Sequence, residues 1–261
     1  MTMLPDLHGR TALVTGASRG IGSAAAAALA AAGANVVVTS RKPDAARAAA
    51  EAIGPNVLGI AAHAAEEDQA RACIDTTLEH FGSLDILVNN AGTNPAYGPL
   101  IAQDHGRFAK TMDVNLWGPI LWTGLAVRAW MGAHGGSVIN TASIGGLGHE
   151  PGIGMYNASK AALIYVTGQL ALELSPSVRV NAVAPGIVRT RLAEALWKEH
   201  EAQVSEATAL GRIGEPTDVA SAIVFLASDA ASWMTGEIMT IDGGQHLGDA
   251  APYRAFGGAL R

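Results

Sequence analysis

A glycine-rich turn between a β-branched run and an alanine-rich run is the feature that most constrains this fold. The segment Thr15-Gly16-Ala17-Ser18-Arg19-Gly20-Ile21-Gly22 joins a strand predicted at residues 11–15 to a helix predicted at 21–32. Such glycines let the backbone approach a pyrophosphate, and the N–H groups that open the helix attract its charge. The first gap is one residue wider than in the usual dinucleotide fingerprint, so an isolated turn of this kind is equally compatible with a plain connection. The flanking strand and helix favour a nucleotide-binding turn.

The rest of the chain alternates short apolar runs with longer helical runs, which is typical of βαβ units around a parallel sheet. The predicted strands cover residues 11–15, 35–39, 57–61, 84–89, 137–141, 178–183 and 238–241. The predicted helices cover residues 21–32, 45–53, 68–81 and 156–174, with further helices within 103–131, 191–207 and 216–227. This order predicts an α/β fold, a doubly wound parallel sheet with helices on both faces. The ligand site of such a sheet lies beyond the carboxyl ends of its strands.

Composition excludes several other classes of protein. The 261 residues are 49% hydrophobic and 15% charged, which argues against a disordered chain. Cys73 is the only cysteine, so we expect neither an internal disulfide nor a structural metal site. The net charge of −6, with scattered Lys and Arg, argues against a nucleic-acid partner. No apolar run reaches the roughly 20 residues of a membrane span, and no leader pattern opens the chain, so we expect a cytoplasmic protein without a membrane partner.

Basic residues follow the second predicted strand, where a dinucleotide fold meets the adenosine ribose. A carboxylate at this position accepts from the ribose 2′-hydroxyl and repels a 2′-phosphate. Here the strand leads into Ser40, Arg41 and Lys42, and Arg19 lies in the glycine-rich turn. Because Arg holds phosphate bidentately, the sequence favours NADP(H) over NAD(H). A solvated charged loop is the alternative explanation for Arg41 and Lys42.

Ser143, Tyr156 and Lys160 are candidates for proton transfer. Ser143 follows a predicted strand and Tyr156 opens the next helix, so both are expected at the carboxyl edge of the sheet. Residues four apart share a helix face, so Lys160 can approach the Tyr156 phenol. A phenol titrates at about 10 and a nearby cation favours its ionised form, so we expect Lys160 to lower the pKa of Tyr156 toward neutrality. Singly, each residue is more often a cap or a surface contact.

Together these motifs resemble those of the classical short-chain dehydrogenase/reductase family over residues 9–244. The matching features are the glycine-rich turn, Asn89-Asn90-Ala91-Gly92, Asn115 in Asp113-Val114-Asn115, Ser143, Tyr156 and Lys160, Pro185-Gly186 with Thr190, and Asp242-Gly243-Gly244. Within the family, residues 38–42 and 210–216 look most like the NADPH-dependent carbonyl reductases. The resemblance implies one Rossmann-type domain over residues 1–261. It also implies a homotetramer built from the helices that carry Asn115 and Tyr156, with the last strand forming another contact.

The resemblance further implies a role for each matching residue. Tyr156 is the general acid in reduction and the base in oxidation, and Ser143 hydrogen-bonds the reacting oxygen. Lys160 also grips the nicotinamide ribose, and Asn115 helps to hold a water that links Lys160 to solvent. The implied cofactor-binding residues are Gly16, Ser18, Arg19, Gly20, Ile21, Gly22, Ser40, Arg41, Lys42, Ala64, Asn90, Ala91, Gly92, Tyr156, Lys160, Pro185, Gly186, Val188 and Thr190. Where the family often has an acid near the adenine, this chain reads Ala62-His63-Ala64-Ala65, so the Ala64 backbone is left to make the contact.

Residues 144–155 and 187–212 are the expected substrate loops. The candidate substrate contacts are Ser143, His149, Met155, Leu196 and Trp197. An exposed loop position for His149 and simple packing for Trp197 remain alternatives. Apolar residues outnumber charges in these loops, which predicts a mostly apolar ketone or aldehyde substrate, or the matching secondary alcohol.

Two other functions stay open. One is a 3-oxoacyl-thioester reductase of the fatty-acid type, for which Arg128, Arg189 and Arg191 are too few basic residues to decide. The other is a catalytically silent NADP-binding sensor or scaffold. The complete set of Ser143, Tyr156 and Lys160 argues against the sensor, because a scaffold has no chemical need for it.

Overall fold

A seven-stranded parallel sheet in the order β3-β2-β1-β4-β5-β6-β7 forms the centre of the molecule. The computed structural model describes residues 5–250, and residues 1–4 and 251–261 lie outside the described residues. The strands are β1 (Thr11–Val14), β2 (Asn35–Ser40), β3 (Val57–Ala61), β4 (Ile86–Asn89), β5 (Gly136–Thr141), β6 (Val178–Pro185) and β7 (Ile238–Ile241). The strand order reverses between β1 and β4, which pair directly. The crevice of a doubly wound sheet is therefore expected at the carboxyl ends of these two strands.

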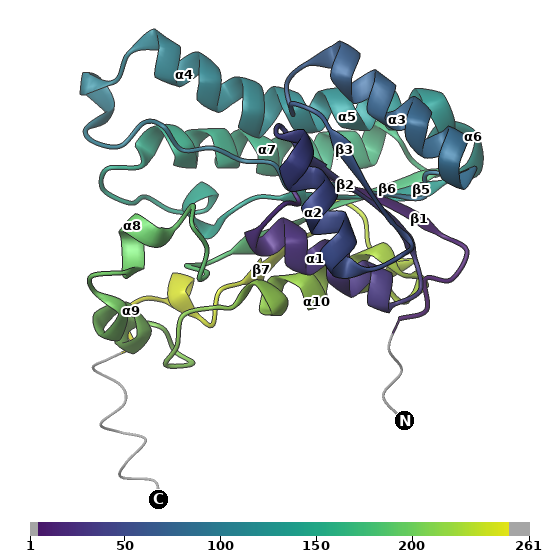
Figure 1. Cartoon of the computed structure of the whole chain (residues 1–261). Helices are drawn as coiled ribbons and strands as arrows, with labels where there is room; N and C mark the ends of the chain where they lie inside the picture. The colour runs from purple at the N-terminus through teal and green to yellow at the C-terminus, as the bar shows by residue number, and fades with distance from the viewer. Residues whose placement is uncertain (1–4, 251–261) are drawn as a thin grey trace, which may run out of the picture.

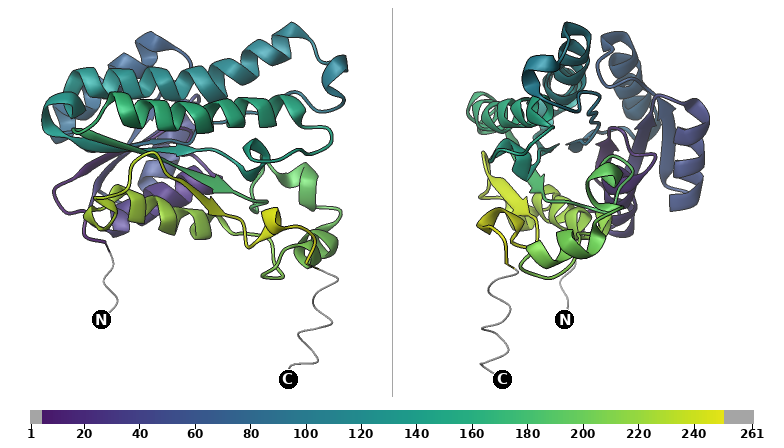
Figure 2. Two further views of the ribbon diagram at one scale, coloured as in Figure 1. Left: turned by 180° about the vertical axis from the view of Figure 1, so that it is seen from behind. Right: turned by 90° about the vertical axis from the view of Figure 1, so that its left-hand side faces the viewer.

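Helices cover both faces of this sheet (Figures 1 and 2). The helices are α1 (Gly20–Ala31), α2 (Pro43–Ile53), α3 (Glu67–Phe81), α4 (His105–Met112), α5 (Gly118–Ala126), α6 (Gly132–His134), α7 (Gly154–Glu173), α8 (Glu194–Trp197), α9 (Glu201–Ala207) and α10 (Pro216–Ala227). Two core clusters follow from this layering, one with α1 and α10 and the other with α3 and α5. The fold is thus the predicted single-domain Rossmann-type α/β domain.

The central strands are apolar throughout because both of their faces are covered. In β1, Val14 lies in the core with α1 and α10, whereas Leu13 lies in the core with α3 and α5. In β2, Val38 likewise lies in the core with α1 and α10, and Val37 lies in the core with α3 and α5. Successive side chains of a strand point to opposite faces, so a parallel strand between two helical layers needs apolar residues at consecutive positions.

Two predicted helices differ from the observed ones. The helix expected within residues 103–131 runs from His105 to His134 and contains two π-helical turns, at Asp113–Trp117 and Val127–Met131. The helix expected within 191–207 is split into the short helices α8 and α9. No described helix is both long enough and apolar enough to cross a membrane.

Figure 1 shows α8, α9 and the start of α4 at the same end of the molecule. The tail 245–261, whose role the sequence leaves open, is described only to residue 250. Its described part contains a short 3-10 helix at Gln245–Leu247.

Candidate active site

The glycine-rich turn is pressed against the segment that follows β4. A Cβ on Gly16 would lie 2.8 Å from the Ala91 Cα, and one on Gly22 would lie 2.3 Å from the Asn90 Nδ2. The Asn90 amide donates to the Thr15 and Gly16 carbonyls at 2.9 and 3.2 Å. Gly16 also has a φ of +64°, which favours glycine. Close packing and backbone conformation therefore both require glycine in this turn.

The first turn of α1 is open to an anion. Arg19 precedes the helix without capping it through its side chain, and the first turn contains no acidic residue. Uncapped N–H groups at a helix N-terminus bind phosphate. The residues of this edge therefore fit the pyrophosphate of a dinucleotide cofactor.

The cations that the sequence predicts at the ribose end of this sheet edge have no carboxylate partner within the described residues. Ser40 ends β2, and its hydroxyl accepts from the Lys42 backbone N–H at 3.3 Å. Arg19, Arg41 and Lys42 are exposed, and within residues 5–250 none of them forms an ion pair. The acid closest in sequence, Asp44, lies 3.6 Å from Arg47 instead.

The structure brings Ser143, Tyr156 and Lys160 together. Ser143 caps a 3-10 helix at Ile144–Gly146 by accepting from the Gly145 N–H at 3.1 Å, and its hydroxyl lies close enough to the Tyr156 phenol to lower the pKa of that phenol. Tyr156 lies in the first turn of α7, and the Lys160 Nζ lies 5.6 Å from the centroid of its ring. Lys160 is 3% exposed, and its ammonium donates to the Thr141 carbonyl at 2.6 Å. The three side chains thus form one cluster between β5 and α7, in which Lys160 is buried and Ser143 and Tyr156 are partly buried.

Burial dominates the protonation of this cluster. It raises the pKa of Tyr156 to about 12; the hydrogen bond with Ser143 lowers that value, and the Glu150 charge raises it. Burial also lowers the pKa of Lys160 to about 8. The prediction that Lys160 lowers the pKa of Tyr156 is therefore wrong for the structure described. The helical spacing brings the two residues together, but it does not show the desolvation that shifts their pKa values.

Asn115 lies in the π-helical turn at Asp113–Trp117 and connects the loop after β4 to α7. Its side chain accepts from the Thr93 N–H at 2.8 Å and donates to the Thr93 carbonyl at 2.9 Å. It also donates to the Ser159 hydroxyl at 3.0 Å, and that hydroxyl donates to the Tyr156 carbonyl. Asn115 therefore holds the loop after β4 against the first turns of α7, next to Tyr156.

The segment after β6 closes the other side of the crevice. A Cβ on Gly20 would meet the Thr190 side chain at 3.3 Å, so Thr190 lies against the glycine-rich turn. Pro185 ends β6, Gly186 packs against Asp242, and Val188 is buried in the core with α1 and α10.

The predicted substrate contacts have different surroundings. His149 is exposed, whereas Met155, Leu196 and Trp197 are partly buried. Trp197 stacks on the Arg189 guanidinium at 5.1 Å, which supports the packing alternative for this residue.

Sequence reasoning missed Tyr97 and Leu100 in the loop after β4. A Cβ on Gly152 would lie 3.2 Å from the Tyr97 ring, and one on Gly154 would lie 3.7 Å from the Leu100 side chain. Both residues therefore lie beside the chain that leads into Tyr156. Their position soon after Asn89-Asn90-Ala91-Gly92 is the sequence signal that could have identified them.

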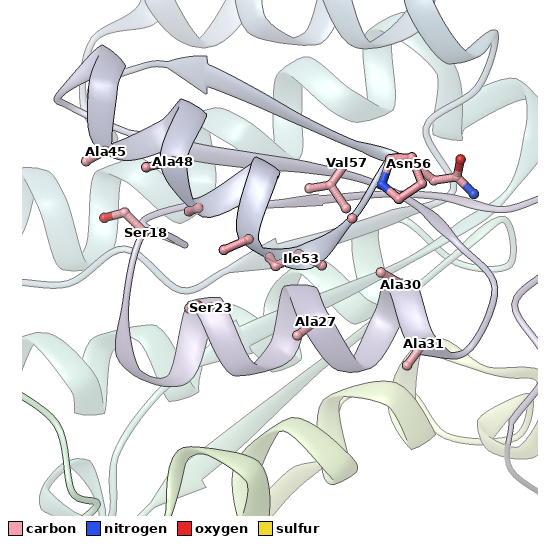
Figure 3. Close-up of a pocket in the computed structure, with 14 residues that line it drawn as sticks. Ser18, Ser23, Ala27, Ala30, Ala31, Ala45, Ala48, Ile53, Asn56 and Val57 are labelled. Carbon is pink, nitrogen blue, oxygen red and sulfur yellow. The ribbon is translucent and has the colours of Figure 1, made fainter.

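A groove of about 760 Å³ between α1 and α2 is separate from this cluster (Figure 3). Half of the residues that line it are alanine, and none of the catalytic candidates lines it. Ser18 and Ala45 lie at the same end of the groove, so the glycine-rich turn and the start of α2 are neighbours there.

Known proteins are similar to nearly the whole chain. The family described as Enoyl-(Acyl carrier protein) reductase matches residues 16–246. Dehydrogenase/reductase SDR family member 4 of Homo sapiens is 39% identical over 250 residues, which cover 94% of this chain and 90% of that protein. The protein of the same name from Caenorhabditis elegans is 37% identical over 247 residues, which cover 91% of this chain and 95% of that protein.

Solved structures are similar over nearly the whole chain. A short-chain type dehydrogenase/reductase from Mycobacterium marinum has a TM-score of 0.87 at 38% identity, covering 93% of this chain and 97% of that one. A short-chain dehydrogenase/reductase from Brucella melitensis, described as glucose/ribitol dehydrogenase, has a TM-score of 0.89 at 33% identity, covering 93% and 99%.

Proposed function

The chain belongs to the classical short-chain dehydrogenase/reductase family, and from that premise we propose that it is an NADP(H)-dependent carbonyl reductase. It reduces a ketone or aldehyde, or oxidises the matching secondary alcohol. The observation that carries this proposal is the cluster that Ser143, Tyr156 and the buried Lys160 form at the carboxyl edge of the sheet.

Each member of the cluster has a role in this proposal. A bound nicotinamide supplies or accepts the hydride. Tyr156 donates its phenolic proton to the carbonyl oxygen, and its raised pKa keeps that proton in place at neutral pH. Ser143 hydrogen-bonds the same oxygen. Lys160 holds the nicotinamide ribose, and Asn115 supports proton resupply by the water that the family resemblance implies.

The preference for NADP(H) rests on the cations at the ribose end. Arg19, Arg41 and Lys42 have no carboxylate partner within the described residues, so their charges are available for a 2′-phosphate. Ser18 lies near the start of α2, which adds a hydroxyl and a helix N-terminus to the same region (Figure 3). The remaining cofactor contacts are proposed for the residues named from the sequence.

The substrate is proposed to be mostly apolar and uncharged. Tyr97, Leu100 and Met155 lie beside the chain at the start of α7 and supply apolar surface there, and Leu196 in α8 is a further apolar candidate. Glu150 places a negative charge close enough to raise the pKa of Tyr156, and this charge disfavours an anionic substrate. His149 and Trp197 are weaker candidates for contact, given their exposure and packing.

A 3-oxoacyl-thioester reductase is the second candidate, because the matching family is described by an acyl-carrier-protein activity. Such a substrate favours a basic surface for its phosphopantetheine arm. Arg189 does not provide that surface, since its guanidinium already donates to Glu201 and Glu215, each at 2.8 Å. The carbonyl reductase therefore remains the first proposal, and a homotetramer is proposed with it.

The experiment compares NADPH and NADH oxidation with a panel of apolar ketones and aldehydes in wild type and Ser40→Asp. The wild type should prefer NADPH by at least about tenfold, and a carboxylate at position 40 should reverse that preference because it repels a 2′-phosphate. Ser232→Asp, an exposed site on the β7 side, controls for the added charge alone. An unchanged preference in Ser40→Asp would contradict the proposed phosphate site. NADPH binding without any turnover across the panel would favour the silent sensor.

A further inference from the structure

A buried tryptophan of α5 holds the loop that follows β3. The Trp122 indole N–H donates to the Ala64 carbonyl at 3.0 Å. Trp122 is 1% exposed and lies in the core with α3, so its ring has no freedom to leave this contact without a rearrangement of the core. The contact joins two segments 58 residues apart in the sequence.

Gly118, one helical turn before Trp122, brings α5 against the same carbonyl. A Cβ at this position would lie 2.8 Å from the Ala64 oxygen, closer than real Cβ atoms approach. Residues four apart share a helix face, so Gly118 and Trp122 meet the loop from the same side. The glycine permits the close approach, and the tryptophan makes the hydrogen bond.

The remaining donors of this loop are almost all used. The Ala62 N–H donates to the Ser40 carbonyl at 3.0 Å, and the His63 N–H donates to the Gln69 side chain at 2.8 Å. The Ala65 N–H donates to the His63 ring, and the Glu66 N–H donates to the His63 carbonyl. Within residues 5–250, the Ala64 N–H is the one backbone donor of segment 62–66 without a hydrogen-bond partner.

This donor lies near the ribose end of the crevice. Ala61 pairs with Ser40 in the β2–β3 register, and Ala62 bonds directly to Ser40. A base attached to a ribose at Ser40 can therefore reach the loop on the neighbouring strand. Ala64 has only a methyl side chain, so Ala64 can make a polar contact only through its backbone. The contact with Trp122 fixes the Ala64 carbonyl, in the peptide group next to the one that carries the Ala64 N–H.

We propose that Trp122 is a positioning residue for the adenine end of the cofactor site, acting through the Ala64 carbonyl to aim the Ala64 N–H at the base. This inference rests on the proposed cofactor site. Gly118 contributes by letting α5 approach the loop. The role belongs to the cofactor's adenine half alone, so it should leave the nicotinamide half and the catalytic cluster unaffected.

The test measures the Kd for NADPH in Trp122→Phe and compares it with a matched variant, Trp130→Phe. Trp130 lies on the same helical run, but its indole N–H has no hydrogen-bond partner. We expect the Kd of Trp122→Phe to rise about fivefold, the size of one ordinary hydrogen bond, and the Kd of Trp130→Phe to stay unchanged. Gly118→Ala should raise the Kd in the same direction, and it serves as the test if Trp122→Phe does not fold.

Turnover with reduced nicotinamide mononucleotide, which lacks the adenosine half, separates positioning from general damage. Its kcat/KM should be the same in wild type and Trp122→Phe. An unchanged NADPH Kd in Trp122→Phe would overturn the role of Trp122. An equal fall in kcat/KM with NADPH and with reduced nicotinamide mononucleotide would also overturn it. Either result would leave the proposed function intact. A wild type that binds neither NADPH nor NADH would overturn the proposed function itself.

Discussion

At the scale of single residues, desolvation shifts the pKa values of the proposed catalytic residues Tyr156 and Lys160 more than charge pairing does. Lys160 donates to the Thr141 carbonyl, and its charge is stabilised there rather than by a carboxylate. With its pKa raised to about 12, the phenol keeps its proton at neutral pH, although it is a weaker acid than a free phenol. The protonated phenol is the form that carbonyl reduction requires, and the ionised form that alcohol oxidation requires is scarce near neutrality.

The pH dependence of both directions follows from these shifts. Reduction should be constant near neutrality and fall above about pH 8, where Lys160 loses its proton. Oxidation should rise as pH increases, since it needs the ionised phenol. Glu150→Gln removes a charge that raises the pKa of Tyr156, so its oxidation profile should move to lower pH.

The measurement is kcat against pH in both directions, with Glu173→Gln at the far end of α7 as the matched control. An oxidation profile that stays in place in Glu150→Gln, or moves equally in the control, would contradict the assigned influence of Glu150.

At the scale of elements, the strands and the main helices could be predicted because their patterns are local. A strand between two helical layers needs a continuous apolar run, as in Val36, Val37 and Val38, and such a run is visible in sequence. The π-helical turn around Asn115 and the split between α8 and α9 accompany tertiary contacts. Asn115 bonds to Thr93, and Arg189 bonds to Glu201 in α9. Contacts between distant segments have no signature in the local pattern.

Arg189 contacts both α8 and α9 and links them to the residue before α10. Its guanidinium donates to Glu201 in α9 and to Glu215 before α10, and it stacks on Trp197 in α8. Arg189→Met should raise the KM for the carbonyl substrate several-fold, because the segment loses its attachment, while the NADPH Kd stays near wild type. The melting temperature should change little, since exposed ion pairs contribute weakly.

Steady-state kinetics with Glu194→Gln, which breaks the exposed pair of Glu194 with Lys198 in α8, provide the control. An unaltered KM in Arg189→Met would show that α8 and α9 do not form part of the substrate site.

At the scale of the whole molecule, α7 carries an apolar stripe that the described residues leave uncovered. Tyr165 is 74% exposed and Leu172 is 79% exposed, and their spacing of seven places both on one face of the helix. Exposed apolar patches of this kind mark contacts between proteins. The stripe lies on the helix that carries Tyr156, in agreement with the proposed homotetramer.

Changing Tyr165 and Leu172 together to Arg should therefore reduce the mass of the assembly, measured by light scattering. Ile101→Arg, at a residue 99% exposed in the loop after β4, is the control and should leave the mass unchanged. A wild type that is monomeric at micromolar concentration would refute the assembly.

The most direct test of the central claim is the single-turnover rate of carbonyl reduction in Tyr156→Phe, with the NADPH Kd measured on the same samples. If Tyr156 supplies the proton, the rate should fall by about two to four powers of ten while the Kd stays near wild type. Tyr165→Phe, on the exposed face of the same helix, should retain the wild-type rate. A Tyr156→Phe variant that reduces its substrate at nearly the wild-type rate would contradict the account.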